Sequence, residues 1–212
     1  NTCIHNIYIK KRYSKKFDLD RKFIDKFKEV NFNYIFLNSR KIYKTGKNLK
    51  ENSKKNQKNF YEKNKIITEK YLIKKIGKKL ISLRISNVIG KRIYKNSRSN
   101  HRLFFDNFLE YKKSNKILIV KNDFKDFISI DQFCRIIHQI IMKKIIGIFN
   151  VSLSKKVFIS EIVGWIDKKY IKKLKFIKSN QDSFTLSNQK LIRKIDYRPT
   201  KKELKLFCNK LI

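Results

Sequence analysis

Residues 59–90 read NFYEKNKIITEKYLIKKIGKKLISLRISNVIG, and this stretch decides the fold class. Its first part, residues 59–76, has the polar and apolar spacing of a helix and ends before Gly77, a residue type that often stops helices. Residues 79–85 form a short apolar run that predicts a buried strand, and residues 86–90 lead away from its carboxyl end. A helix followed directly by a buried strand is typical of a parallel sheet covered by helices.

The flanking sequence repeats this alternation. Upstream, residues 17–30 carry apolar side chains at helical spacing and precede a short buried strand at residues 34–37. Residues 44–58 are polar and predict a surface loop. Downstream, we expect strands at residues 117–120, 126–130 and 147–151, and helices from residue 131 and at residues 160–168, 187–194 and 200–211. The sequence therefore predicts an α/β protein.

The composition is strongly basic. The 54 lysine and arginine residues, against 17 acidic ones, give a formal net charge of +37, which fits a nucleic-acid or other polyanion partner. However, the chain has no alanine, five glycines and one proline, whereas lysine, isoleucine and asparagine, whose codons are AT-rich, are abundant. The lysines are also scattered, with short dense patches at residues 10–16, 54–58 and 168–175. We attribute the charge to base-composition drift and do not expect a nucleic-acid partner.

The spacing of cysteines and histidines argues against a disulfide framework and against a metal site. The cysteines at positions 3, 134 and 208 and the histidines at positions 5, 101 and 138 lie far apart, without a metal-ligand pattern. No apolar stretch reaches the roughly 18 residues that a membrane span needs. We therefore expect a cytoplasmic protein without a metal or a membrane partner.

A tyrosine followed four residues later by a lysine can support proton transfer on a helix, because the ammonium charge lowers the pKa of the phenol. The spacing alone is a weak signal in this lysine-rich chain, where about two chance matches are expected. Four matches occur, starting at Tyr43, Tyr61, Tyr71 and Tyr197. Tyr61 alone combines its lysine, Lys65, with an upstream strand-end hydroxyl, Ser39, and with a position at the start of a helix. We expect the other three tyrosines to be surface or packing residues.

Several segments carry a family resemblance in their order along the chain. They are residues 34–43 (YIFLNSRKIY), 51–53 (ENS), 59–65 (NFYEKNK) with Glu69, 83–90 (LRISNVIG), 125–131 (KDFISID) and 147–151 (GIFNV). Together they resemble the extended short-chain dehydrogenase/reductases, specifically the NAD-dependent epimerase/dehydratase group that works on nucleotide sugars. The first segment resembles the serine motif of that group, in which the catalytic serine, here Ser39, precedes a tyrosine by four positions.

The resemblance implies a Rossmann-like parallel sheet and a proton-transfer centre. Tyr61 would exchange a proton with a sugar hydroxyl or carbonyl while hydride passes to or from NAD or NADP. Lys65 would hold the nicotinamide ribose and depress the pKa of Tyr61. Ser39 would hydrogen-bond the reacting oxygen of the substrate. The resemblance therefore makes these three residues the catalytic set.

The resemblance also implies further contacts and an assembly. Ser86 would join Tyr61 and Lys65 as a cofactor contact. Asn87 and Lys125 would join Ser39 at a nucleotide-sugar substrate. The active-site helix would pair with its copy in a homodimer. The sugar, the nucleotide, the choice between NAD and NADP, and the reaction subtype, whether epimerase, dehydratase or reductase, stay open.

The sequence departs from the family pattern in three places. Lys125 stands where the family usually has an arginine that grips the diphosphate, so the bidentate fork is lost there. A helix asparagine that completes a proton relay is replaced near Asp18 or Asp20. The five glycines lie too far apart for the glycine-rich cofactor turn. We therefore expect about 60 to 70 residues with that turn to precede residue 1, and the 212 residues alone neither to hold NAD(P) tightly nor to turn over.

We expect two domains. Residues 1–90 would form the second half of the Rossmann domain with the active-site helix. Residues 91–212 would form mainly the smaller α/β substrate domain, with residues 117–145 partly returning to the Rossmann sheet. Two alternatives stay open: a non-catalytic basic remnant that binds nucleic acid or another polyanion, and a degenerate gene product. The retained catalytic set argues against both alternatives.

Overall fold

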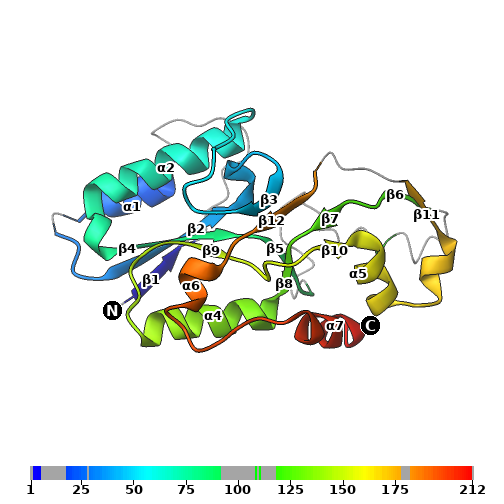
Figure 1. Cartoon of the computed structure of the whole chain (residues 1–212). Coiled ribbons are helices and arrows are strands. Elements are labelled where there is room, and N and C mark those ends of the chain that lie inside the picture. The colour runs from blue at the N-terminus through cyan, green and yellow to red at the C-terminus, as the bar shows by residue number, and fades with distance from the viewer. Residues whose placement is uncertain are drawn as a thin grey trace.

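The centre of the fold is a parallel sheet. The structure is a computed structural model that describes residues 2–5, 18–27, 29–91, 108, 110, 118–177 and 182–211. Four parallel strands form the sheet in the spatial order β1 (Thr2–His5), β2 (Asn33–Ser39), β4 (Leu80–Ile85) and β9 (Gly147–Val151). Figure 1 shows helices on both sides of these strands. The predicted α/β fold with a Rossmann-like parallel sheet is therefore confirmed.

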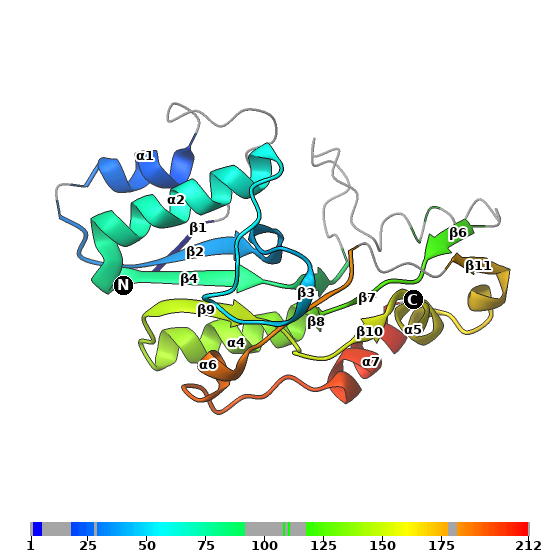
Figure 2. The same cartoon turned by 45° about the horizontal axis from the view of Figure 1, so that its top comes forward.

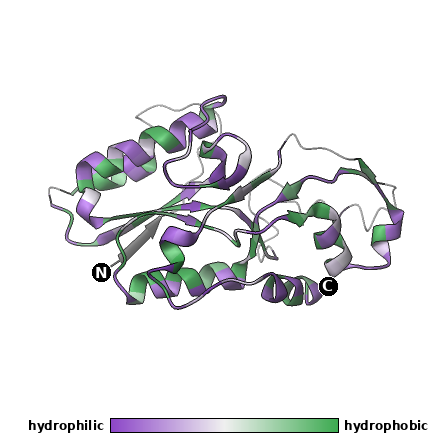
Figure 3. Ribbon diagram, in the orientation of Figure 1, coloured by the Kyte–Doolittle hydropathy of each residue, from purple (hydrophilic) through white to green (hydrophobic). Residues whose placement is uncertain are grey.

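Two helices cover one face of the sheet and another covers the opposite face. Helices α1 (Leu19–Asp25) and α2 (Phe60–Ile76) lie together on the first face, and α4 (Ile130–Met142) lies on the second (Figures 1 and 2). Figure 3 shows hydrophobic and hydrophilic residues alternating along α4, as expected for a helix with one side on a core. The order strand, helix, strand along the chain thus builds three layers.

The pleat of β2 explains how one strand serves two cores. Tyr34 and Phe36 are fully buried in the cluster under α1 and α2, together with Leu72 of α2. Ile35, between them in sequence, is fully buried in the larger cluster on the other face. Successive side chains of a strand point to opposite faces, so an uninterrupted apolar run fits a strand covered on both sides.

Helix α2 is the element that carries the candidate catalytic pair, and local signals set its ends. Asn59 caps its N-terminus: the Asn59 side chain accepts a hydrogen bond from the Glu62 backbone N–H, and Glu62 reaches back to the Asn59 N–H. The helix ends at Ile76, as predicted. Gly77 keeps right-handed backbone angles and continues into a short 3-10 turn, η3 (Gly77–Lys79), which leads directly into β4.

The rest of the chain forms small two-stranded sheets beyond the carboxyl edge of the main sheet. The pairs are β3 (Gly46–Leu49) with β12 (Phe184–Leu186), β5 (Asn87–Ile89) with β8 (Phe127–Ser129), β6 (Leu118–Lys121) with β11 (Leu174–Ile177), and β7 (Phe124–Lys125) with β10 (Val157–Phe158). The helices of this part are α5 (Ile159–Ile166), η4 (Tyr170–Lys173), α6 (Gln189–Ile192) and α7 (Lys201–Asn209). Figure 2 shows α5, α7, β6 and β11 at the end of the molecule away from α1.

Three expectations about elements need adjustment. The polar loop expected at residues 44–58 contains strand β3, because its backbone pairs with β12 from far along the chain. The helix expected at residues 17–30 is shorter, because the chain leaves α1 and buries Val30 before β2 begins. The irregular stretch expected at residues 91–116 lies almost entirely outside the described residues.

The return of the chain to the main sheet also differs in detail from the expectation for residues 117–145. Helix α4 packs under the sheet, and β9 is the strand that pairs with β4, in a register that aligns Ile81 with Gly147 and Ile85 with Val151. The returning segment therefore extends past residue 145 to the end of β9. The division into two domains at residue 90 stays a prediction.

A buried carboxylate connects the main sheet to the small sheets beyond its carboxyl edge. Asp126, directly before β8, has no exposed surface and accepts hydrogen bonds from the backbone N–H groups of Leu153, Ser154 and Leu186. These donors lie just after β9 and in β12. Asp126 thereby holds three separate segments at the carboxyl edge of the sheet, which is where open α/β sheets bind their ligands.

Candidate active site

Ser39 lies at the carboxyl end of β2. It is the N-cap of the 3-10 turn η2 (Arg40–Ile42), and its Oγ accepts a hydrogen bond of 3.2 Å from the backbone N–H of Lys41. That bond uses the hydroxyl oxygen as an acceptor, so the hydroxyl hydrogen can serve another oxygen. Ser39 pairs with Ile85 in the register of β2 and β4. The predicted strand-end position of Ser39 is therefore at the same sheet edge as residues 86–90.

Lys65 reaches the same strand from helix α2. Its side chain is buried, with 8% of the residue exposed, and its Nζ donates a hydrogen bond of 2.9 Å to the carbonyl of Leu37, two residues before Ser39. Burial lowers the pKa of Lys65, although the nearby charges of Asp20 and Asp18 act in the opposite direction. The fold thus brings a buried ammonium group to the end of the strand that carries the candidate serine.

Tyr61 lies one helical turn before Lys65, in the first turn of α2, and is partly exposed. Residues four apart on a helix share a face, so the phenol and the ammonium group are on the same side of α2. Helix α2 packs against η2, the turn that begins after Ser39. The three predicted catalytic residues therefore come from two elements that touch each other.

The acidic residues expected near the relay position sit on α1. Asp18 caps α1 and accepts a hydrogen bond of 2.6 Å from the Thr68 hydroxyl of α2. Asp20 accepts one of 2.6 Å from the Tyr34 hydroxyl of β2. Both carboxylates are buried, so their charge acts on Lys65 with little screening by solvent.

A cavity of about 470 Å³ lies beyond the same sheet edge. Its walls include Ser86, Asn87, Lys125, Phe127 and Ile159. The three residues predicted to bind cofactor or substrate outside the catalytic set, Ser86, Asn87 and Lys125, are thus gathered around one cavity. Ser39, Tyr61 and Lys65 are not among the residues that line it.

Ser86 lines this cavity and has a buried side-chain hydroxyl. It is 7% exposed, and its Oγ has no hydrogen-bond partner in the part of the chain that the structure describes. Leaving a buried hydroxyl without a partner costs about 1 to 3 kcal/mol. The Oγ atom itself is inaccessible to solvent, so a polar ligand group in the cavity would remove that cost only if the Ser86 side chain turned toward it.

Lys125 is engaged by a residue that the sequence analysis missed. Its Nζ lies 2.9 Å from Asp182 Oδ2, and the guanidinium of Arg40 contacts the same carboxylate through two bonds. Burial would raise the pKa of Asp182, but the hydrogen bonds and charges of Arg40 and Lys125 lower it to about 2. No local signal links Arg40 to Asp182, because 142 residues separate them.

A second missed feature is a buried ion pair behind the candidate catalytic residues. Glu69 of α2 and Arg84 of β4 are both nearly inaccessible, with Arg84 Nη2 2.6 Å and Nε 3.0 Å from the Glu69 carboxylate. Asn38 Nδ2 and the Ser82 hydroxyl also donate to Glu69 Oε1. Burial would raise the pKa of Glu69, but the hydrogen bonds and charge of Arg84 outweigh it and lower the pKa.

Tyr43 completes this network. It was expected to be a surface or packing residue, and the structure buries it with 3% exposed. Its hydroxyl donates to Asn150 Oδ1 at 2.7 Å and accepts from Arg84 Nη1 at 2.7 Å. Burial raises the pKa of Tyr43 to about 12, although Arg84 acts in the opposite direction. Tyr43 therefore stays neutral and links β4 to β9 through hydrogen bonds.

Within the described ranges, no group of three or more histidine, cysteine, aspartate or glutamate residues is arranged to hold a metal ion. Among the same residues, no helix has the length and apolar character required to cross a membrane. Cys134 is an exposed free thiol and Cys208 a buried one.

Comparison with known proteins gives one family match and many structural matches. The sequence profile of the NAD dependent epimerase/dehydratase family matches residues 8–152, more than half of the chain. No curated protein sequence matches the chain.

Solved structures share the fold at low sequence identity. UDP-glucuronic acid 4-epimerase from Bacillus cereus in complex with NAD has a TM-score of 0.75 and 17% identity, and the match covers 98% of this chain and 72% of that one. UDP-N-acetylglucosamine 4-epimerase from Methanobrevibacter ruminantium in complex with UDP-N-acetylmuramic acid has a TM-score of 0.66, 21% identity and coverages of 84% and 61%. dTDP-glucose 4,6-dehydratase from Bacillus anthracis in complex with NAD has a TM-score of 0.68 and 15% identity, and the match covers 92% of this chain and 63% of that one. The chain thus spans less than two thirds of the length of the last two structures.

Proposed function

The chain belongs to the NAD-dependent epimerase/dehydratase family, and from that membership we propose that it is an epimerase, dehydratase or reductase for a nucleotide sugar, with Ser39, Tyr61 and Lys65 as its reaction centre. The observation that carries the proposal is the hydrogen bond from Lys65 Nζ to the Leu37 carbonyl. It joins the Tyr61 helix to the Ser39 strand at the carboxyl edge of the sheet.

The proposed proton transfer follows from the chemistry of the three side chains. The Tyr61 phenol exchanges a proton with a sugar hydroxyl or carbonyl oxygen. The Lys65 charge, one turn away, stabilises the phenolate, and its surroundings at low dielectric strengthen that effect. The Ser39 hydroxyl donates a hydrogen bond to the reacting oxygen and holds it near the phenol.

NAD or NADP, when bound, supplies or accepts the hydride. Ser86 would contact it from the cavity wall, and Tyr61 and Lys65 would contact its ribose. Asn87 and Lys125, on the wall of the same cavity, would bind the sugar nucleotide. The cavity volume of about 470 Å³ fits the range of small-molecule sites.

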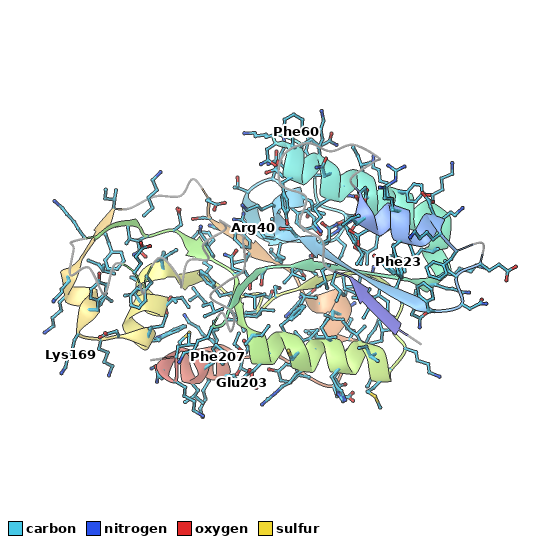
Figure 4. All side chains as sticks on the ribbon, turned by 180° about the vertical axis from the view of Figure 1, so that it is seen from behind. Phe23, Arg40, Phe60, Lys169, Glu203 and Phe207 are labelled. Carbon is cyan, nitrogen blue, oxygen red and sulfur yellow. The ribbon has the colours of Figure 1, made fainter. Side chains whose placement is uncertain are left out.

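We also propose a homodimer formed through α2 and a cytoplasmic location. Phe60, labelled in Figure 4, is 63% exposed, and Ile67, two helical turns later on the same face of α2, is 37% exposed. Covering such side chains with a second copy of the helix would remove them from water. The wide cysteine spacing fits a reducing compartment.

The substitution Tyr61→Phe, in the protein expressed from its complete coding sequence, tests the proposed function. We expect kcat for the nucleotide-sugar reaction to fall by about 10²- to 10⁴-fold, because the general acid or base is lost, while nicotinamide binding is kept. The measurement is product formation by chromatography, together with cofactor binding by calorimetry.

Tyr71→Phe is the matched control, because Tyr71 has the same spacing to a lysine and donates a hydrogen bond to Asp25 outside the proposed centre. It should keep full activity. Unchanged turnover in Tyr61→Phe, or an equal loss in Tyr71→Phe, would contradict the proposal. Steeply salt-dependent binding of RNA or DNA that is indifferent to Tyr61→Phe would instead support the polyanion alternative.

A further inference from the structure

Asn38, the residue before Ser39 in β2, is buried and uses both ends of its side-chain amide. Its Oδ1 accepts a hydrogen bond of 2.8 Å from the backbone N–H of Ser39, and its Nδ2 donates one of 2.9 Å to Glu69 Oε1. A carboxylate only accepts and a backbone N–H only donates, so this orientation of the amide is the one that satisfies both partners. Asn38 therefore connects the backbone of the candidate serine to the helix that carries Tyr61 and Lys65.

The register of the sheet places Asn38 under Glu69. Asn38 pairs with Arg84 where β2 and β4 lie side by side, and Ser82 precedes Arg84 by two residues, so it shares the same face of β4. All three side chains donate hydrogen bonds to the Glu69 carboxylate. Glu69 is fully buried and Arg84 binds both of its oxygens, so the carboxylate is a fixed partner for the Asn38 amide.

Helix α2 contacts the end of β2 at two adjacent residues. Lys65 Nζ donates to the Leu37 carbonyl at 2.9 Å, and Glu69, one helical turn later, binds the Asn38 amide. The first contact fixes the peptide group before Asn38. The second fixes the peptide group after it, through the bond from Oδ1 to the next backbone N–H. The backbone on both sides of Asn38 is therefore bound to the active-site helix.

We propose that Asn38 is a positioning residue for the reaction centre, and that through Glu69 it sets where the Ser39 backbone lies relative to Tyr61 and Lys65. The inference rests on the proposed function for the reaction itself. Asn38 is not among the residues that line the cavity, so its role is to hold Ser39 and not to bind a ligand. Because catalysis requires its groups to be aligned, a small displacement of Ser39 should slow the reaction.

The substitution Asn38→Ala, in the protein expressed from its complete coding sequence, removes both hydrogen bonds and leaves the three proposed catalytic residues in place. We expect kcat for the nucleotide-sugar reaction to fall by about 10- to 100-fold while KM stays within about twofold, because alignment in the transition state is lost and substrate binding is not. Hydrogen exchange of the Ser39 backbone amide, followed by NMR, should become about tenfold faster, since that N–H loses its acceptor.

Ser82→Ala is the matched control. Ser82 is also buried, and its hydroxyl donates a hydrogen bond of 2.6 Å to the same oxygen of Glu69, but among the described residues it has no hydrogen bond to Ser39. It should lower the urea midpoint of unfolding about as much as Asn38→Ala does, because each removes a donor from one buried carboxylate. It should leave kcat and the exchange of the Ser39 amide unchanged.

Asn38→Asp keeps the size of the side chain and the acceptor for the Ser39 N–H, and it covers the case in which the alanine variant does not fold. The new carboxyl group can donate to Glu69 only while the two carboxyl groups share a proton. Arg84 and Lys55, the cations that contact Glu69, favour the loss of that proton. The ratio of kcat to the wild-type value should therefore fall as the pH rises, and a ratio independent of pH would contradict the need for a donor here.

Three further results would overturn the inference. They are a wild-type kcat in Asn38→Ala, an equal loss of kcat in Ser82→Ala, and equal exchange of the Ser39 amide in both variants. A wild type without any nucleotide-sugar turnover would contradict the proposed function. Faster exchange of the Ser39 amide in Asn38→Ala alone would still support the link from Ser39 to Glu69. Failure of the proposed reaction and failure of the positioning contact are therefore separate outcomes.

Discussion

Two charge clusters near the carboxyl edge of the sheet each pair an arginine with a carboxylate, and the two carboxylates differ in their exposure to solvent. In the first, the inner cluster, Glu69 and Arg84 form a doubly hydrogen-bonded ion pair whose side chains are 0% and 2% exposed. In the second, the outer cluster, Arg40 also makes two hydrogen bonds, of 2.9 and 3.0 Å, to Asp182, whose side chain is 47% exposed. Arg84 binds Glu69 through Nε and Nη2, and Arg40 binds Asp182 through Nη1 and Nη2. Each arginine thus makes two bonds to one carboxylate, and the larger difference between the pairs lies in access to water.

Access to water decides what each pair can do. A buried ion pair has given up hydration on both sides, so neither partner can be removed without leaving an uncompensated charge. Glu69 and Arg84 therefore fix α2 against β4 and keep the Tyr61 helix in position. In the outer cluster the carboxylate can return to water, so the same type of bond can open at a lower cost.

The largest effect is expected from Glu69→Ala. Arg84 would remain buried without its counter-ion, so the free energy of unfolding should fall by about 3 to 5 kcal/mol in urea denaturation. The double substitution Glu69→Leu with Arg84→Met removes both charges and should recover much of that loss. A decrease below about 1 kcal/mol in Glu69→Ala would show that the inner cluster is no more structural than the outer one.

A smaller loss is expected from Tyr43→Phe, which removes only a hydroxyl from the inner network. Asn150 Oδ1 loses its donor and Arg84 Nη1 loses one acceptor, so unfolding should become easier by about 1 to 3 kcal/mol. Thermal and urea unfolding measure the change. Tyr71→Phe, at a less buried position, should stay within about 0.5 kcal/mol of the wild type. Equal destabilisation by Tyr43→Phe and Tyr71→Phe would contradict the structural role of the buried hydrogen bonds of Tyr43.

The smallest effect on stability is expected from Asp182→Asn, below about 1 kcal/mol, because the carboxylate is half-exposed. The folded-state pKa of Asp182 is lowered to about 2 from an ordinary value of 3.8. Its contribution to stability is therefore present above the ordinary pKa and is lost as the pH falls toward 2. The difference in unfolding free energy between wild type and variant, measured over that acidic range, should shrink with falling pH. A difference that stays constant would contradict this assignment.

Much of the architecture could be predicted from local patterns. The helix expected at residues 59–76 is α2, and the strand at residues 147–151 is β9. The short β3 strand could not be predicted from residues 44–58, because its sequence is polar and only pairing with the distant β12 defines it. Similarly, the apolar pattern of residues 79–85 indicates a strand and does not show that Arg84 within it is fully buried.

The candidate site divides in the same way. Ser39, Tyr61 and Lys65 could be selected because strand ends and helix spacing are local, and their catalytic roles stay predictions. Arg40 and Asp182 could not be connected, since they are 142 positions apart in the sequence and no local pattern relates them. Lys125 was singled out, and only the structure shows that its charge is shared with Arg40 around one carboxylate.

Local sequence patterns are therefore enough to predict the α/β class, the helix that carries Tyr61 and Lys65, and the strand that ends at Ser39. Helix caps, side-chain periodicity and turns act between neighbours along the chain, so they are readable there. Which charges are buried, which share a partner and which line the cavity can be seen only in the folded chain. Those properties depend on the packing of segments far apart in sequence, because burial sets both the cost of a charge and its freedom to exchange its partner.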